Sequence, residues 1–301
     1  MQGLYLPLIT AFRDGELDEH STRRMLRHYA NQPIDGLILA ATTGEGMTLT
    51  ANETHRLVTL AAEEMAGRKT ILLGLTGSDT AKLTEDLRRV NDWPIDGYLI
   101  ACPYYTRPSQ LGLYGHFKAL AAATDRPILI YNIPYRTGVN LGNETMLRLA
   151  EVPNIAGVKD CCADAVQSFD LIRARPPGFA VLTGEDAWFY TAMTLGGDGG
   201  ILASAHIDTA SFRNVYDLIQ GNDMAAALAV WRKLVELPRL LFTEPSPGPI
   251  KHYLWRLGLI DSPETRAPMT GISAPLAERI DAMTGVLART PSGGPDSPWA
   301  S

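Results

Sequence analysis

The chain has 301 residues, of which 46% are apolar and 20% charged, and its formal net charge at pH 7 is −6. This length and apolar fraction suffice for one large domain with an extension, and they exclude disorder for most of the chain. The acidic balance and the lack of a basic run argue against nucleic acid or an anionic membrane as a partner. Small molecules are the expected partners.

The cysteines and the N-terminus bear on the compartment. Cys102, Cys161 and Cys162 are odd in number and two are adjacent, so they build neither a disulfide framework nor a Cys-x-x-Cys site. The first residues lack a basic segment, and no apolar stretch approaches about 18 residues. We therefore expect a cytoplasmic protein.

Short apolar, strand-forming runs recur along the first two thirds of the chain. They cover residues 4–9, 36–39, 70–73, 97–101, 128–131, 155–159, 180–183 and 200–203. Their hydrophobicity is continuous rather than alternating, as parallel strands buried on both faces require. Between them, apolar residues repeat at helical spacing, for example Leu57, Leu60 and Ala61.

This alternation predicts an α/β fold, a closed (β/α)8 TIM barrel with a C-terminal helical appendage. The competing fold is an open doubly wound sheet. Such a sheet normally carries a glycine-rich turn after its first strand, and residues 9–13 contain no glycine.

After the last predicted strand the pattern is helical only, over residues 208–220, 224–237, 249–257 and 274–287. The first of these helices closes the eighth unit. We therefore predict a barrel at 1–220 and a three-helix extension at 221–289. Residues 290–301 are rich in proline, glycine and serine, which predicts a disordered tail.

Lys159 ends a predicted strand, on the side where such barrels build active sites. Partial desolvation there would lower its pKa and supply a neutral, nucleophilic amine, as a Schiff-base lysine requires. A solvated strand-end lysine is the alternative. The other lysines lie in segments of helical or loop pattern, where solvated ammonium groups are expected: Lys69, Lys82, Lys118, Lys233 and Lys251.

Polar residues follow several other predicted strands. Thr42–Glu45 reads as a cap and turn, or as a helix N-terminus that binds a small carboxylate through hydroxyls and amides. Tyr131 ends the strand at 128–131, a position at which a core tyrosine is common. Residues 196–200 form a glycine-rich segment that would let the backbone approach a ligand.

The remaining strand ends limit the chemistry. Glu185 and Asp186 follow the seventh predicted strand, where many barrels bind phosphate, and two carboxylates would repel it. We therefore expect an unphosphorylated substrate. The six histidines are scattered without paired ligand spacing, so no metal site is expected. Covalent catalysis by a lysine is therefore the reaction type that these strand ends favour.

Four spaced motifs at these strand ends resemble the dihydrodipicolinate synthase and N-acetylneuraminate lyase family of pyruvate-dependent class I aldolases, over roughly residues 3–275. They are Thr42–Glu45, Pro103–Tyr105 with Arg107–Gln110 and Gly112–Tyr114, Tyr131–Pro134 with Arg136–Gly138, and Gly157–Asp160. The segments 196–199 and 268–270 add to the match. The resemblance implies a Schiff-base aldolase or lyase that needs no cofactor.

The resemblance also implies roles for individual residues. Lys159 would form an imine with the pyruvate ketone, and Tyr131 would relay protons to and from the carbinolamine. Thr42 would link Tyr131 to Tyr105, which the family reaches through a neighbouring subunit. A homo-oligomer, a dimer of dimers, follows from this role.

The substrate contacts are implied in the same way. Thr43 and the adjacent amides, including that of Gly44, would hold the pyruvate carboxylate, while Gly184 and Ile201 would line the pocket near the lysine. Arg136 resembles the synthase version of the motif, in which an arginine grips the carboxylate of aspartate semialdehyde.

These features favour condensation of pyruvate with L-aspartate 4-semialdehyde, the 4-hydroxy-tetrahydrodipicolinate synthase reaction of lysine biosynthesis. Three departures leave alternatives open: Ala41 replaces a usual glycine, Gly74–Gly77 replaces a usual Gly-Thr-Gly, and Cys161-Cys162 replaces a pair of small residues. A 2-keto-3-deoxy sugar acid aldolase or dehydratase, or a hydroxyproline-pathway lyase or deaminase, would use the same imine. A non-catalytic 2-oxo-acid sensor would not need both lysine and tyrosine.

Feedback regulation forms a last expectation. Lysine-inhibited synthases of the family bind lysine through a histidine, an asparagine and a glutamate, and this chain has Ala51, Ser78 and Lys82 at those positions, although Tyr104 persists. Lys82 would repel the ammonium of lysine. We therefore expect no inhibition by lysine.

Overall fold

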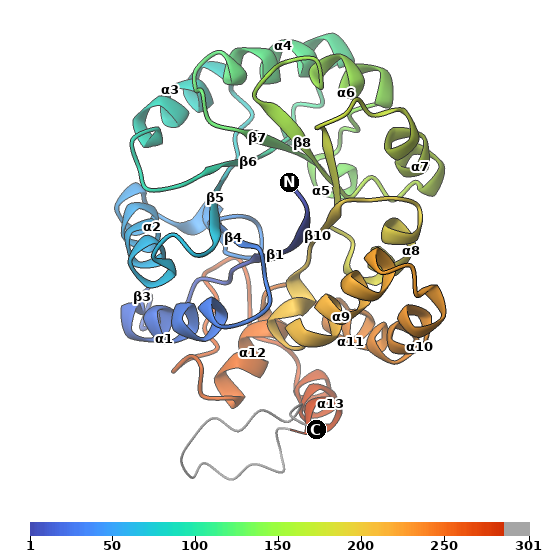
Figure 1. The fold of residues 1–301 in the computed structure, drawn as a ribbon. Coiled ribbons are helices and arrows are strands. Elements are labelled where there is room, and N and C mark those ends of the chain that lie inside the picture. The colour runs from blue at the N-terminus through green and yellow to red at the C-terminus, as the bar shows by residue number, and fades with distance from the viewer. Residues whose placement is uncertain (286–301) are drawn as a thin grey trace.

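A computed structural model describes residues 1–285 of the chain. Eight parallel strands close into a barrel inside a ring of helices (Figure 1), in the order β1-β10-β9-β8-β7-β6-β5-β4. They are β1 (Gly3–Pro7), β4 (Gly36–Leu39), β5 (Thr70–Leu75), β6 (Gly97–Ala101), β7 (Ile128–Asn132), β8 (Ile155–Asp160), β9 (Ala180–Thr183) and β10 (Gly199–Ile201). Each overlaps one predicted run, so the TIM-barrel prediction is confirmed.

The outer helices follow the strands in sequence. They are α1 (Glu19–Ala30), α2 (Ala51–Met65), α3 (Thr80–Val90), α4 (Gln110–Ala121), α6 (Asn143–Leu149), α7 (Ala165–Ala174), α8 (Phe189–Thr194) and α9 (Thr209–Gln220). Several begin at a side-chain cap, such as Thr50, which forms a capping box with Glu53 at the start of α2. A hairpin, β2 (Phe12–Arg13) and β3 (Glu16–Leu17), follows β1.

The strands separate two apolar regions. The larger lies between strands and helices and includes Leu37, Val58 and Phe117. A smaller cluster contains Leu72, Leu129, Tyr131 and Ile201 and fills the barrel. The interior is therefore a packed core, and a ligand site has to lie at the strand ends.

Helices also form the C-terminal part of the described chain. They are α10 (Met224–Leu234), α11 (Glu236–Leu241), α12 (Gly248–Arg256) and α13 (Ala274–Thr284). In Figure 1, α12 and α13 (orange to red) lie on the same side of the barrel as α1 and α9. α10 packs against α9, and α12 against the 3-10 turn η3 (Ala203–His206).

This part differs from the prediction in one respect. The single helix expected at 224–237 is two helices, because Pro238 in the first turn of α11 has no N–H for a continuous helical ladder. The expected division at residue 220 stays a prediction, and its boundary at 289 and the tail at 290–301 lie outside the described residues. Within residues 1–285, no helix is long and apolar enough to span a membrane.

Candidate active site

Lys159 and Tyr131 lie side by side at the C-terminal ends of adjacent strands. The parallel register of β7 and β8 pairs these two residues directly. The Lys159 Nζ atom is 4.3 Å from the centre of the Tyr131 ring. Lys159 is only 5% exposed, so the alternative of a solvated strand-end lysine is wrong.

Burial sets the protonation of both groups. Desolvation lowers the pKa of Lys159, although Cys161, Asp186 and Glu185 act in the opposite direction. Burial raises the pKa of Tyr131 well above its usual value, against a smaller opposing effect of a hydrogen bond with the Thr42 side chain. The pair therefore combines a weakened ammonium with a hydroxyl that keeps its proton.

Gly184 follows β9 and lies against the lysine side chain. Its N–H donates to the Asp160 carbonyl at 2.9 Å, which carries the β8–β9 pairing one residue beyond β9. A Cβ atom at this position would lie 2.3 Å from Lys159 Cε and 2.4 Å from Cys161 Sγ. Only hydrogen fits there. Ile201, on β10, is fully buried in the barrel cluster that includes Tyr131 and Cys161.

The turn Thr42–Glu45 follows β4 and is fixed by its backbone. The Glu45 N–H donates to the Thr42 carbonyl at 3.1 Å, and Glu45 takes a left-handed φ of 52°. The Gly44 carbonyl accepts from Thr10 Oγ1 at 2.6 Å. Thr43 is buried, whereas Thr42 is exposed beside Tyr131.

One interpretation of this turn is wrong. The threonines do not lie at a helix N-terminus, because a three-residue 3-10 turn, η1 (Gly46–Thr48), follows and α2 begins at Ala51. The left-handed Glu45 and the close approach of Gly46 to the Ala40 backbone prevent continuous helix here. A carboxylate at Thr43 would therefore rely on hydroxyls and local amides rather than on a helix dipole.

Arg136 lies on a short helix, α5 (Pro134–Thr137), that directly follows β7. Proline starts this helix and Gly138, with a left-handed φ of 77°, ends it. The Arg136 side chain is exposed at the rim, and its guanidinium carbon is 5.8 Å from the centre of the Tyr135 ring. The Tyr135 hydroxyl donates to Glu185 Oε1 at 2.9 Å.

Asp186 links the segment that follows β9 to the segment that follows β10. It is buried and accepts hydrogen bonds from the backbone N–H groups of Ala203 and Ser204. Desolvation raises its pKa to about 6. Amides that follow the last strand of a barrel are phosphate ligands in many such enzymes, and here a carboxylate occupies them. This agrees with an unphosphorylated substrate.

Tyr105 is exposed in its own chain, unlike the buried Lys159 and Tyr131. Its ring is 90% exposed, while its N–H donates to the Thr137 carbonyl at 3.0 Å. The loop also places Tyr105 and Arg107 at left-handed φ values of 67° and 47°. The backbone is thus anchored and the ring projects from the surface.

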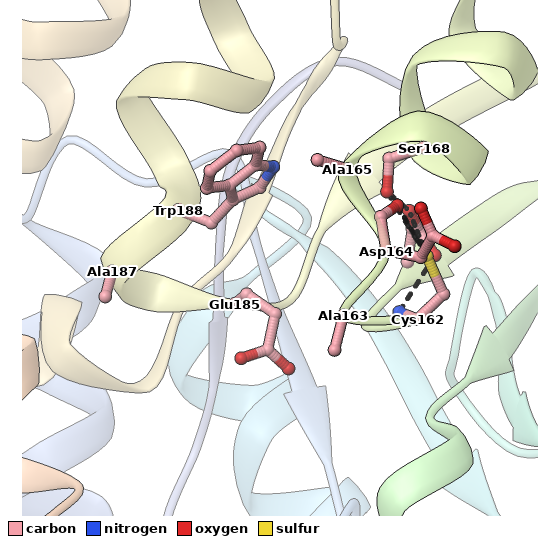
Figure 2. Close-up of a pocket in the computed structure, with 9 residues that line it drawn as sticks. Cys162, Ala163, Asp164, Ala165, Ser168, Glu185, Ala187 and Trp188 are labelled. Atoms are coloured by element: carbon pink, nitrogen blue, oxygen red, sulfur yellow. Dashed lines mark hydrogen bonds between the residues drawn. The ribbon is translucent and has the colours of Figure 1, made fainter.

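A pocket of about 260 Å³ lies beside the lysine, at the ends of β8 and β9. Figure 2 shows Cys162, Asp164 and Ser168 on one side and Glu185 and Trp188 on the other. Ser168 Oγ donates to the Asp160 carboxylate at 2.5 Å. Lys159 is not among the residues that line this pocket.

The environment of Lys251 differs from the expected solvated one. The side chain was expected in solvent, but α12 buries it completely, and its Nζ atom forms an ion pair with Glu45. The pattern of apolar residues along α12 could not reveal this ion pair, because Glu45 lies 206 positions earlier in the chain than Lys251. The sequence feature that could have indicated a buried cationic partner was Glu45, which ends the Thr-Thr-Gly-Glu motif.

A parallel barrel with a buried lysine and a buried tyrosine in register at its strand ends has the groups of a Schiff-base enzyme. The sequence model of the Dihydrodipicolinate synthetase family matches residues 1–284. The chain belongs to this family.

Individual relatives agree with the family match. The chain is 42% identical over 281 residues to "4-hydroxy-tetrahydrodipicolinate synthase 2" of Clostridium acetobutylicum, covering 93% of this chain and 98% of that protein. It superposes on dihydrodipicolinate synthase from Aquifex aeolicus with a TM-score of 0.91, at 30% identity and coverages of 96% and 98%. The enzyme from Acinetobacter baumannii, solved with pyruvate, gives 0.90 at 32% identity and coverages of 95% and 99%.

Proposed function

We propose that this protein is a 4-hydroxy-tetrahydrodipicolinate synthase that condenses pyruvate with L-aspartate 4-semialdehyde through an imine on Lys159. The observation that carries the proposal is the burial of Lys159 in register with Tyr131. Relatives that bear this name at moderate identity support it, and so does the pyruvate complex of the Acinetobacter baumannii enzyme.

The chemistry follows from the two buried groups. The neutral Lys159 amine attacks the pyruvate ketone, and Tyr131 moves protons so that the carbinolamine loses water and becomes the imine. The imine acidifies the pyruvate methyl group, which loses a proton to give the enamine. The enamine carbon bonds to the aldehyde carbon, and the aldehyde oxygen takes a proton. The amino group of the condensed semialdehyde then loses a proton as it attacks the imine carbon and displaces the Lys159 amine, which closes the ring of the product and frees the lysine.

The surrounding residues hold the carboxylates of the two substrates. Thr43 and the amides of the turn that contains Gly44 would bind the pyruvate carboxylate. Arg136, which is exposed at the rim, would bind the carboxylate of the aldehyde. Gly184 and Ile201 would line the pyruvate side of the pocket. The distances of these groups from Lys159 are set by the ends of four different strands, β4, β7, β9 and β10.

The mechanism is tested by reduction of the imine. Sodium borohydride with pyruvate should inactivate the protein and add one reduced pyruvate to Lys159, located by mass spectrometry of peptides. Lys159→Arg should give no adduct, since a guanidinium stays protonated. Lys118→Arg changes an exposed lysine in the same way and serves as the control. An adduct on another lysine, or none, would refute the mechanism.

A second measurement separates the substrates. Condensation of pyruvate is followed with a panel of aldehydes that contains aspartate semialdehyde, sugar-acid-derived aldehydes and unsubstituted aldehydes. We expect the largest kcat/KM for aspartate semialdehyde. A larger value for a sugar-derived aldehyde would assign the protein to the 2-keto-3-deoxy sugar acid aldolases. That result would leave the proposed imine on Lys159 unchanged.

We also propose a homo-oligomer, a dimer of dimers, located in the cytoplasm. The exposed Tyr105 ring supports the oligomer, because a residue with the proposed relay role has to be buried against a partner. The acidic composition supports small-molecule substrates rather than nucleic acid or membrane partners.

A further inference from the structure

Glu45 ends the turn that contains Thr42 and Thr43, and its side chain is buried. One oxygen pairs with Lys251 Nζ, and the other accepts the Arg266 N–H at 2.9 Å. The side chain of Glu45 is only 2% exposed and that of Lys251 is not exposed at all. The partners of this carboxylate therefore come from the C-terminal part of the chain and not from the barrel.

The Lys251 ammonium group also contacts residues other than Glu45. Its Nζ atom donates to the Glu264 carbonyl at 2.7 Å and lies 4.4 Å from the centre of the Phe12 ring. Without an opposing charge, a buried ammonium is strongly unfavourable, so the ion pair with Glu45 is required for this packing. One cation thus joins the turn after β4, the β2 hairpin and the segment after α12.

Arg266 makes a parallel set of contacts around the same turn. Its guanidinium pairs with Glu53 of α2 and donates to the Thr48 carbonyl at 2.9 Å and the Gly15 carbonyl at 2.7 Å. These contacts hold η1 and the start of α2, but they do not reach Thr42 or Thr43. The Glu45–Lys251 pair has the more direct connection to the substrate turn.

From this arrangement we propose that Lys251 is a positioning residue for the substrate turn. Its ammonium group holds Glu45 and thereby sets the Thr43 hydroxyl and the Gly44 amide for the pyruvate carboxylate. The inference rests on the proposed function, since it assigns pyruvate to that turn.

Titration of Lys251 gives the inference a measurable consequence. Burial lowers the pKa of Lys251 to about 8, although Glu45 and Glu264 oppose the shift. Below that pH the ion pair is intact, and above it a buried carboxylate faces a neutral amine. Affinity for pyruvate is therefore expected to fall as the pH rises through 8.

The other charged groups near α12 are not expected to produce the same pH dependence of pyruvate affinity. Burial lowers the pKa of His206, on η3, to about 4, so this side chain is already neutral at pH 7. On the α13 side, Asp281 pairs with His252 and Arg256. Around Lys251 itself, Arg266 is cationic at any pH below its high pKa, which the hydrogen bond to Glu53 raises further.

The experiment measures the concentration of pyruvate that half-saturates borohydride trapping at Lys159, between pH 6.5 and 9.5, which needs no second substrate. In the wild type this concentration should rise about tenfold across the range. Lys251→Arg keeps a permanent charge and should remove most of the rise. Lys251→Met and Glu45→Gln should be weak binders at every pH, with the trapping rate at saturation changed less than the affinity.

The control variant is Glu53→Gln, which breaks the Arg266 ion pair in the same region and leaves Lys251 untouched. It should be less heat-stable but retain the wild-type pH dependence. Lys159 itself titrates in the same way in the wild type and in Lys251→Arg, so the difference between their two pH profiles isolates Lys251. Coincident profiles of these two proteins would overturn the inference even where the other variants do not fold. Failure of the wild type to trap pyruvate at any pH would instead overturn the proposed function.

Discussion

At the scale of the residue, Gly184 sets the space in which the Lys159 side chain moves. The distances of 2.3 and 2.4 Å that a Cβ atom would make to Lys159 Cε and Cys161 Sγ are too short for any real contact. One of these two buried side chains has to move when the glycine is replaced. The lysine is the longer and more flexible of them, so its amine is displaced first.

Gly184→Ala should therefore slow imine formation about 100-fold, since small misplacements of a reacting group have effects of this size. Overpacking should also lower the free energy of unfolding by about 1–3 kcal/mol. The rate of borohydride trapping and a denaturant titration measure the two effects. Gly77→Ala is the matched control, because its Cβ would meet Leu83 at an ordinary 3.5 Å. Wild-type trapping by Gly184→Ala would contradict the steric argument.

The two buried lysines show what could be predicted from single residues. Lys159 was identified as unusual because it ends an apolar strand, and its burial is a local consequence of that strand. Lys251 is even more deeply buried but lies on an amphipathic helix, and its environment depends on a turn more than 200 positions away. Local pattern carries the first kind of information and not the second.

The glycine-rich segment before β10 gives the same lesson. Its glycines were expected to admit a ligand, but Gly199, with φ of 157°, faces the Gly3 backbone, and a Cβ there would lie 1.9 Å from the Gly3 carbonyl oxygen. This interpretation is wrong because the segment leads into β10 and forms its first two residues, so it lies at the opposite end of the barrel from Lys159. The close approach is between strands, not between the backbone and a ligand.

At the scale of the element, strands were predicted better than turns. A strand buried on both faces needs a continuous apolar run, which is visible in the sequence. The conformation after β4 depends instead on a left-handed glutamate, and nothing in the local pattern distinguishes that turn from a helix start. The candidate site residues were found through motifs, and their geometry came only with the fold.

The start of α3 bears on regulation by lysine. Ser78 Oγ already donates to the Tyr104 carbonyl at 2.6 Å, and Lys82 is exposed in the first turn of α3, where the Asp79 carboxylate accepts its N–H. A cationic ligand would meet a like charge there, at the end of a helix that already repels cations.

Millimolar L-lysine, with both substrates near their Michaelis constants, should therefore leave the rate of condensation essentially unchanged. The assay is a steady-state rate against lysine concentration, with L-norleucine as a control for non-specific effects. Saturable inhibition would show that lysine binds elsewhere. Lys82→Glu, which restores a carboxylate, should bind lysine no worse than the wild type, and weaker binding would contradict the charge argument.

At the scale of the whole molecule, the exposed Tyr105 requires a partner if it takes part in proton relay. Tyr105→Phe keeps the ring and removes only the hydroxyl, so it should preserve assembly while lowering turnover about 100-fold, within the usual range for loss of a proton-transfer group. Sedimentation velocity at assay concentration measures the assembly, and steady-state kinetics measure turnover. Tyr135→Phe, which alters the hydroxyl bonded to Glu185 in the same chain, is a comparison variant.

A wild-type monomer with full activity at assay concentration would remove the relay role from Tyr105. Loss of assembly in Tyr105→Phe would instead make the hydroxyl an interface contact. The sequence predicted the closed barrel from eight spaced runs, but a subunit interface leaves no periodic pattern, so only the resemblance pointed to it.

The closure of the barrel also has a consequence for biosynthesis. β1 pairs with β4 on one side and with β10 on the other, and Gly3 and Gly199 are partners in that second pairing. β10 has three residues, two of them glycine, which form strands poorly without established neighbours. During translation, β1 therefore keeps an unpaired edge until almost 200 residues have been made, and an open edge of this kind is a site of misassociation. We therefore expect the nascent chain to be more prone to misassociation before β10 has left the ribosome than after it has paired with β1.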